Sequence, residues 1–305
     1  MGTMALQTKK RSGINWYKMR MHGAALLFVL PALINFAVFR YYPMIWAFRA
    51  SLWDYSLLGG FRKFVGFDNY VRALTEDKFF WHSLRVTAVF AIGYVPLVVV
   101  LALLLAVFAS QPYRGMGLIR GFIFVPVVTS YIVVSIVWGM VLNKDVGLLN
   151  GFLSTIGLPR MEYLTSIRNA LPTLIGISVW KDVGYSMIIL VAGLRGIPED
   201  YYDAAHLDGA NAWRRFIDVT VPMLRRHLMF VTVISTLFAF QVFVPIYQLT
   251  HGGPARATNV AVYYIYQRAF KFGEMGYASA LSVILLVILM VVSLGQMRLM
   301  RGDDV

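Results

Sequence analysis

The sequence predicts an all-α polytopic membrane protein with six transmembrane helices. Of its 305 residues, 59% are hydrophobic and only 14% are charged, whereas soluble domains carry about 25% charged residues. The apolar residues also fall into six blocks, most of them near the roughly 20 residues with which a helix crosses a bilayer core. We expect these spans at residues 24–39, 86–109, 118–142, 170–194, 228–249 and 277–297.

The first block follows a basic N-terminal segment that includes Lys9, Lys10 and Arg11. Such a start could mark a cleaved signal peptide. However, the apolar residues continue past Arg40 to Trp46, and no small-residue cleavage motif follows. We therefore predict a retained first span.

Basic residues in the connecting loops predict the orientation in the membrane. Their numbers on the two sides are similar, but those on one side lie in shorter loops, and the N-terminal basic cluster is on that same side. We therefore expect a cytoplasmic N-terminal tail at 1–23, a six-span domain at 24–300 and a cytoplasmic C-terminal tail at 301–305. The protein would be a multi-pass component of a bacterial cell (inner) membrane.

Composition argues against several other functions. The chain has no cysteine, and none of its five histidines is paired at metal-ligand spacing, so we predict no disulfide and no metal site. No G-x-x-x-x-G-K-[ST] motif is present to hold ATP, and we predict neither an enzyme nor a cofactor in this chain. The net charge of +13 indicates contact with anionic lipid rather than with nucleic acid.

The longest polar stretch between two apolar blocks spans residues 196–222. Pro198 suits the first position of a helix, and the acidic residues after it suit the first turn. Asp208 and Gly209 indicate a helix end, because glycine adopts the left-handed capping conformation at little cost.

A second helix is expected to start near Ala210 or Asn211 and to be closed by Pro222. The stretch therefore predicts a helix–turn–helix between two spans, a shape that suits binding to a partner protein. The alternative is an amphipathic hairpin at the membrane surface that only anchors the chain.

Three motifs in this stretch resemble the EAA loop of permease subunits of bacterial ABC importers. They are Asp203-Ala204-Ala205, Asp208-Gly209-Ala210 and Val219-x-Val221-Pro222. The family pattern begins Glu-Ala-Ala and ends Ile-x-Leu-Pro, so this chain departs from it by a shorter acid and by two valines. In the family the loop is a coupling helix that inserts into a cleft of a cytoplasmic ATPase.

The resemblance implies a role for each residue of the motif. Asp203 would contact a basic residue of the ATPase, Ala204 and Ala205 would allow close approach, and Gly209 would permit the turn. Asp208, Ala210 and Pro222 complete the predicted coupling set.

Three further motifs resemble the carbohydrate-uptake group of these permeases. Residues 64–70 fit F-x-G-x-x-N-Y, residues 250–254 fit T-x-G-G-P, and Tyr-Ala-Ser-Ala at 277–280 leads into the last span. The resemblance implies a second homologous permease, expected in a heterodimer, two ATP-binding subunits that hold ATP and Mg²⁺, an extracytoplasmic solute-binding protein and a carbohydrate substrate.

Charged residues near the centre of the fourth span are candidates for the solute path. Lys181 and Asp182 are costly at the bilayer midplane and will not face lipid. We expect Asp182 to have a structural or interface role, and Lys181 or its neighbour Trp180 to be a path candidate.

The fifth span carries aromatic residues beside an amide. A sugar path needs flat apolar faces together with polar groups for hydroxyls, and Phe240, Gln241, Phe243 and Tyr247 supply both. Pro245 should disturb the helix here and free backbone carbonyls. Asn35 in the first span is a weaker candidate.

The sequence offers little support for two other classes of function. An ion-coupled secondary transporter needs intramembrane acids, and only Asp182 qualifies. A membrane-bound enzyme would need clustered acids or histidines, and the sequence shows none.

Overall fold

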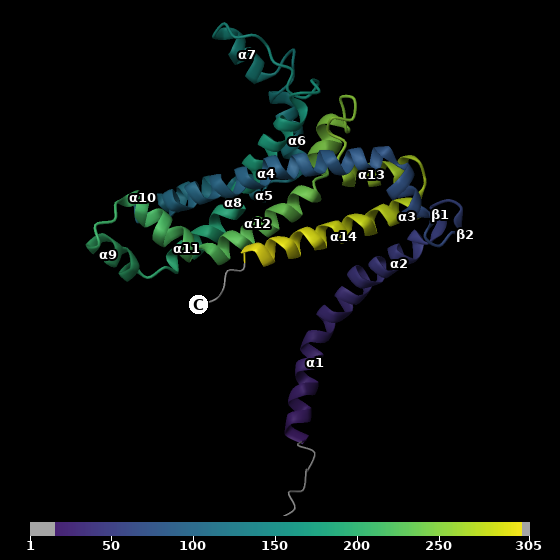
Figure 1. Cartoon of the computed structure of the whole chain (residues 1–305), viewed down its shortest axis with the longest axis horizontal. Helices are drawn as coiled ribbons and strands as arrows, with labels where there is room; N and C mark the ends of the chain where they lie inside the picture. The colour runs from purple at the N-terminus through teal and green to yellow at the C-terminus, as the bar shows by residue number, and fades with distance from the viewer. Residues whose placement is uncertain (1–15, 301–305) are drawn as a thin grey trace, which may run out of the picture.

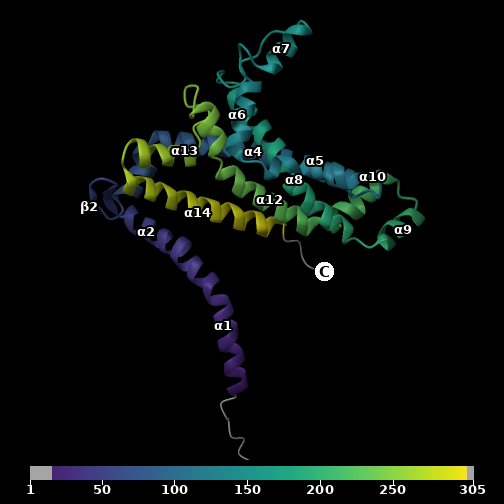
Figure 2. The ribbon, with the colours of Figure 1, turned by 180° about the vertical axis from the view of Figure 1, so that it is seen from behind.

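The computed structural model describes residues 16–300, and within them side-chain environments for residues 26–299. The described chain is largely helical, which confirms the predicted fold class. Figures 1 and 2 show α4 (Lys78–Ser110), α5 (Met116–Val128), α8 (Ala170–Arg195), α12 (Arg225–Phe240) and α14 (Met275–Met300) side by side as a bundle. The predicted tails at 1–15 and 301–305 lie outside the described residues.

Four helices in the described part of the chain are long and apolar enough to span a membrane: Leu26–Ser51, Lys78–Ser110, Ala170–Arg195 and Met275–Leu299. Two bent helix pairs could add two further spans. One of them is α5 with α6 (Tyr131–Val141), which meet at 95°, so residues 118–142 are not the straight span that we predicted. Thr129 and Ser130 cause the break, because both have extended backbone angles that end the helical hydrogen bonding.

The other predicted span that is broken is 228–249. Helix α12 ends at Phe240, and a π-helical turn, Ile246–Thr250 (η4), begins only after Pro245. Helical structure resumes at Val244 and Pro245, and a proline in the first turn of a helix has no N–H to leave unpaired. The break that we expected at Pro245 therefore lies before it, at residues 241–243, and Pro245 itself has helical backbone angles.

The first span is one curved helix made of α1 (Trp16–Phe36), a π-helical turn (Ala37–Tyr41, η1) and α2 (Tyr42–Ser51). α2 packs against α14, whereas α1 extends away from the bundle in both views (Figures 1 and 2). Its apolar side chains are exposed, Phe28 at 85% and Leu27 at 71%. This surface needs lipid or another subunit to cover it.

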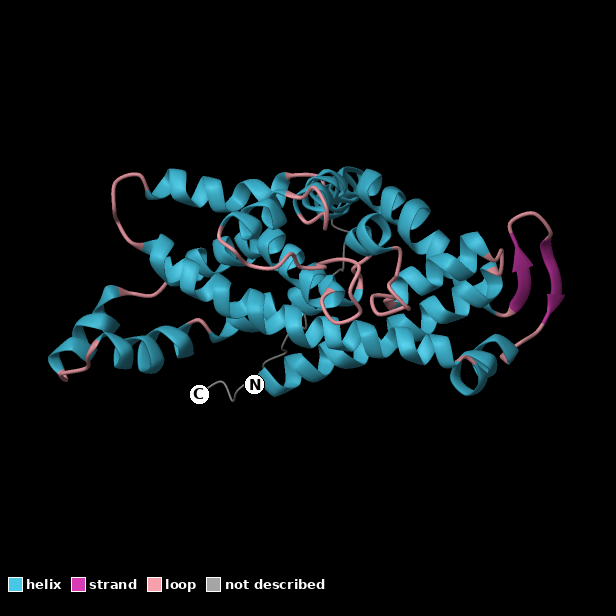
Figure 3. Cartoon of the chain, turned by 90° about the horizontal axis from the view of Figure 1, so that it is seen from above, coloured by secondary structure: helices cyan, strands magenta, loops and turns pink. Residues whose placement is uncertain are grey.

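A small β-hairpin follows the first span, formed by β1 (Trp53–Ser56) and β2 (Gly60–Phe64) (Figure 3). The motif at 64–70 ties the hairpin to the end of α2. Asn69 donates its amide to the carbonyls of Ser51 and Trp53, and the Tyr70 and Ser51 hydroxyls lie 2.6 Å apart. α3 (Asp68–Val71) and a π-helical turn (Arg72–Glu76, η2) then lead to α4.

A buried carboxylate joins three helices near this hairpin. Asp77 caps α4 through the amides of Phe79 and Phe80, and its Oδ2 accepts 2.6 Å hydrogen bonds from the hydroxyls of Tyr264 and Tyr277. Burial raises the pKa of Asp77, but the tyrosine and backbone hydrogen bonds outweigh this effect and lower it below its usual value. Tyr264 belongs to α13 (Ala261–Tyr266), and burial together with Asp77 raises its pKa to about 12.

The remaining elements form the two ends of the bundle and a projecting lobe. α7 (Leu148–Thr155) projects beyond α6, and a π-helical turn (Gln267–Lys271, η5) continues α13. At the opposite end from the β-hairpin lie α9 (Glu199–Leu207), α10 (Ala212–Arg215), a π-helical turn (Phe216–Thr220, η3) and α11 (Val221–Met223).

Candidate functional site

The helix–turn–helix expected in residues 196–222 is present. Asp208 ends α9, and Gly209 follows with φ +76°, the left-handed conformation for which glycine is suited. Asn211 then caps α10, its Oδ1 accepting from the Arg214 amide at 2.9 Å. At the start, Pro198 is the capping residue rather than the first helical one.

Pro222 does not close the second arm, contrary to our expectation. It lies in the first turn of α11, where its missing N–H costs nothing. The π-helical turn before it has already changed the hydrogen-bond pattern. The chain continues and bends by 70° into α12 next to Leu224.

The tip of this hairpin presents its side chains outward. Asp203, Ala204 and Asp208 are exposed, while Ala205 and Ala210 are half-buried. Leu207 is 88% exposed and Trp213 67%. The Tyr202 and Thr220 hydroxyls lie 3.1 Å apart and join the two arms. The predicted coupling residues thus share one projecting element that carries both acids and exposed apolar groups.

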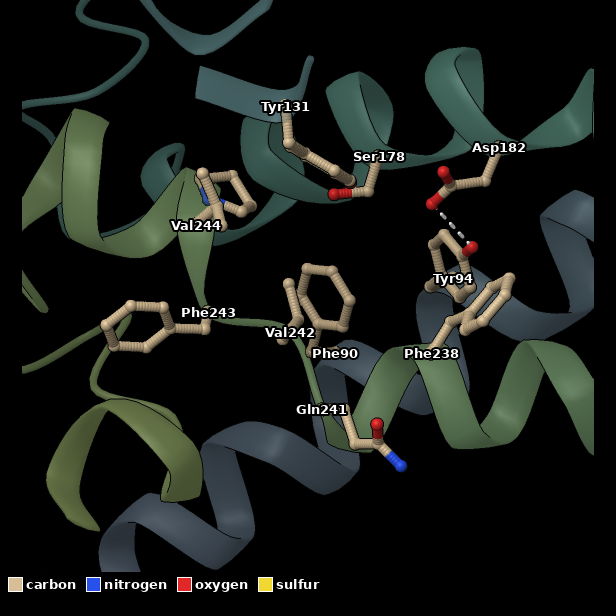
Figure 4. Close-up of a pocket in the computed structure, with 11 residues that line it drawn as sticks. Phe90, Tyr94, Tyr131, Ser178, Asp182, Phe238, Gln241, Val242, Phe243 and Val244 are labelled. Carbon is tan, nitrogen blue, oxygen red and sulfur yellow. Dashed lines mark hydrogen bonds between the residues drawn. The ribbon is translucent and has the colours of Figure 1, made fainter. Parts of the chain in front are cut away.

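An internal cavity of about 330 Å³ opens where α12 ends (Figure 4). Its walls come from α4, α6, α8 and the chain around the break. The lining residues are Phe90, Tyr94, Tyr131, Ser178, Asp182, Phe238, Gln241, Val242, Phe243, Val244 and Pro245. It therefore combines aromatic faces with hydroxyl, carboxyl and amide groups.

The predicted path residues of the fifth span are divided between this cavity and its surroundings. Gln241 and Phe243 line the cavity. Phe240 is buried and lines a separate groove between α4 and α14. Tyr247 lies behind Phe243, with ring centroids 5.4 Å apart, among other aromatic rings.

Comparison with known proteins decides the family. Residues 77–301 match the family described as binding-protein-dependent transport system inner membrane component. This chain belongs to that family.

Named relatives extend over most of the permease. It is 35% identical over 275 residues to the probable ABC transporter permease protein YesP of Bacillus subtilis, covering 89% of this chain and 88% of the relative. It is 36% identical over 273 residues to the lactose transport system permease protein LacF of Rhizobium radiobacter, covering 88% and 90%. The trehalose/maltose transport system permease protein MalF of Thermococcus litoralis is 32% identical, covering 87% and 89%.

A solved structure has the same fold as the permease. A chain of the crystal structure of a bacterial alginate ABC transporter, in complex with an alginate pentasaccharide-bound periplasmic protein, superposes with a TM-score of 0.82 at 23% identity, covering 95% of this chain and 98% of that one. The resemblance that the motifs indicated is thus confirmed. The chain is a multi-pass inner-membrane permease, a transporter component rather than an enzyme.

Besides Phe240 and Tyr247, three more of the permease's predicted path residues lie outside the cavity. Lys181 is 6% exposed, and its amine donates to the carbonyls of Pro126 and Val127 at 3.2 Å, at the end of α5. Trp180 packs edge-on against Trp138. Asn35 is exposed on α1, away from the bundle (Figure 1).

Sequence reasoning missed the polar wall that α8 and α4 build. Asp182, for which we expected a structural or interface role, lines the cavity and accepts a 2.9 Å hydrogen bond from the Tyr94 hydroxyl. Ser178 lies one turn before it. Residues one apart on a helix do not share a face, whereas residues four apart do. The Ser178–Asp182 spacing was therefore the available signal, and the adjacency of Lys181 was misleading.

Proposed function

We propose that this permease forms half of the translocation pathway of an ATP-driven sugar importer. The observation that carries the proposal is the cavity at the break of α12. Its lining combines the aromatic residues Phe90, Phe238 and Phe243 with the polar residues Asp182 and Gln241. In Figure 4 the Asp182 and Gln241 side chains lie on opposite sides of the view. Sugars have apolar C–H faces and hydroxyl rims, so they match such a wall. The names of the lactose and trehalose/maltose relatives support the same substrate class.

A second, homologous permease would complete the pathway, most simply as a heterodimer. The exposed apolar surface of α1 offers area for such a contact or for lipid. An extracytoplasmic binding protein would deliver the sugar, in keeping with the family description and with the periplasmic protein in the alginate transporter complex.

Two ATPase subunits would bind ATP and Mg²⁺ and supply the energy. The hairpin of α9 and α10 is the contact that we propose for one of them. Asp203 would pair with a basic residue of the ATPase, since charge-assisted hydrogen bonds are the stronger ones. Ala204 and Ala205 leave room for close approach, and the exposed Leu207 and Trp213 supply apolar area.

The position of the hairpin in the chain gives it leverage on the cavity. It connects α8, which carries Ser178 and Asp182, to α12, which carries Phe238 and leads to Gln241. A displacement of the hairpin therefore moves two walls together. We propose that ATP-driven closure of the ATPases changes the side of the membrane to which the cavity opens.

This arrangement implies a membrane orientation and a division of the chain. The hairpin and both termini would lie in the cytoplasm, and the cavity would open alternately to either side. Residues 24–300 would form the six-span domain, with the two bent helix pairs each contributing to one span. The segments 1–23 and 301–305 would be cytoplasmic tails.

The variant Gln241→Ala tests the placement of the sugar path. The complete transporter, reconstituted in liposomes with its binding protein, should lose about tenfold in sugar uptake, because an amide that meets sugar hydroxyls contributes about 0.5–1.5 kcal/mol per hydrogen bond. Assembly and basal ATPase rate should be unchanged. Unchanged uptake would show that the path lies elsewhere. Uptake that needs no ATP and stops when an ion gradient is removed would instead favour a secondary transporter.

A further inference from the structure

We propose that Asp182 makes the cavity selective for sugars without negative charge, and that it discriminates against sugar acids and sugar phosphates. The charge selection is a property of this chain's own side chains. Its application to sugars rests on the function proposed above.

The carboxylate of Asp182 lines the cavity beside the hydroxyls of Tyr94 and Tyr131. One of its oxygens, Oδ2, accepts from the Tyr94 hydroxyl at 2.9 Å, and this is the hydrogen bond drawn in Figure 4. None of the ion pairs formed within the described part of the chain includes Asp182. The cavity wall therefore carries an acid without an ion-pair partner within 4 Å among the described residues, and the neighbouring Lys181 acts on it only at longer range.

The neighbouring lysine does not fill that role. Lys181 lies on a different face of α8, where its amine donates hydrogen bonds to the carbonyls of Pro126 and Val127. The same amine also makes a cation–π contact with Tyr131, 4.8 Å from the centroid of the ring. Two opposite charges that are adjacent in the sequence thus serve different surfaces, one a helix–helix contact and the other the cavity.

A second polar group beside the acid lacks a hydrogen bond of good geometry. Ser178 is 1% exposed and lines the cavity; its hydroxyl interacts with that of Tyr131 but has no partner with good hydrogen-bond geometry among the described residues. Buried hydroxyls are normally paired. A sugar hydroxyl that donates to Asp182 can also pair with Ser178, one helical turn away.

Electrostatics then determines which solutes enter. A carboxylate accepts hydrogen bonds from two hydroxyls at once. A negatively charged group in the same place meets a like charge across an effective dielectric constant of about 20, so repulsion is several times stronger than in water. Neutral and amino sugars are therefore accepted, whereas uronates and sugar phosphates are repelled.

The absence of cysteine from the chain allows a test that needs no knowledge of the transported sugar. Phe238→Cys places a thiol in the cavity wall, and Leu58→Cys places one on the β-hairpin turn, far from the cavity. The complete transporter in nanodiscs is treated with a cationic trimethylammonium-ethyl or an anionic sulfonatoethyl methanethiosulfonate. The extent of modification over time is measured from the mass of this chain.

We expect the cationic-to-anionic rate ratio at position 238 to exceed that at position 58 by at least tenfold. Adding Asp182→Asn, which removes the charge and keeps the size, should bring the two ratios to within about twofold. Tyr94→Phe keeps the charge and should preserve the tenfold difference. Should Asp182→Asn fail to assemble, Asp182→Ser removes the charge with a smaller side chain.

An unchanged ratio after the charge is removed would overturn the proposal. Sugar uptake is measured separately with neutral sugars and uronates and the transporter's binding protein. If no sugar is carried, the proposed function fails while the charge measurement stands. If sugars are carried but the reagent ratio ignores Asp182, only the selectivity proposal fails.

Discussion

Gly209 shows how one residue can carry a mechanical role. Its φ of +76° lies in the left-handed region, and no heavy atom lies within 4 Å of the position where a Cβ would stand. A larger side chain would therefore have room at this position. The requirement for glycine comes from the backbone, because a β-branched residue in this conformation costs about 1–2 kcal/mol or more.

Gly209→Val should therefore uncouple the transporter. The strain would change the angle between α9 and α10 without filling any cavity, so the protein should fold while sugar-stimulated ATP hydrolysis and uptake lose their fixed ratio. Gly209→Asn is the matched control, because asparagine tolerates the left-handed conformation. The measurement is uptake per ATP hydrolysed in proteoliposomes. A Gly209→Val transporter with the normal ratio would contradict the coupling role of the hairpin.

Asp77 gives a pH prediction at the same scale. Its folded pKa is lowered, so its contribution to stability is complete above the unfolded value of about 3.9 and is lost as pH falls through the lower folded value. Asp77→Asn should destabilise the protein by about 1–3 kcal/mol at pH 7, because two buried tyrosine hydroxyls lose a charged acceptor. The melting-temperature difference from the wild type should be constant above pH 5 and shrink below pH 4. A melting-temperature difference that stays constant down to pH 3 would contradict this role of the Asp77 charge.

The contact between α8 and α5 depends on the absence of a side chain at Gly184. A Cβ on Gly184 would clash with the backbone carbonyl oxygen of Ile123 and press on Val127. The two helices can therefore approach closely enough for Lys181 to reach the last carbonyls of α5. This packing holds in place the helix that carries the polar wall of the cavity.

Gly184→Ala should lower the melting temperature and reduce assembly, because backbone atoms cannot move aside as a flexible side chain can. Gly176→Ala on the same helix is the matched control. No atom lies within 4 Å of its added Cβ, and alanine favours a helix over glycine by up to about 1 kcal/mol. The two variants should shift thermal stability in opposite directions. Equal shifts would show that the contact is not limiting.

The same elements show what could be predicted from sequence. Length and hydropathy predicted α4, α8 and α14, because a continuous apolar run has few alternatives in a bilayer. The bend at Thr129 and Ser130 was missed, since both residues occur in membrane helices and the break is a property of their tertiary setting. The side of α8 that faces the cavity was missed for a similar reason. Helical spacing relates Ser178 to Asp182, but it does not say which face meets the path.

At the scale of the whole molecule, the bundle separates two surfaces. The α9–α10 hairpin and the β1–β2 hairpin lie at opposite ends of the bundle in Figure 1. If one end contacts an ATPase and the other faces the binding protein, then single thiols at the two ends should differ in their access from either side of the membrane. Leu207 and Leu58 are the exposed positions for this comparison.

In protoplasts or spheroplasts with intact membranes, a membrane-impermeant maleimide should label Leu58→Cys and leave Leu207→Cys unlabelled until the membrane is opened. The reverse pattern would invert the orientation, and labelling of both would show that the two ends share one side. In inside-out vesicles, the thiol at position 207 should react slowly while the ATPase is bound and at least tenfold faster after urea strips the ATPase from the membrane. This second step separates a hairpin that binds a motor subunit from one that only lies at the lipid surface, because only the former is covered by a protein that can be removed.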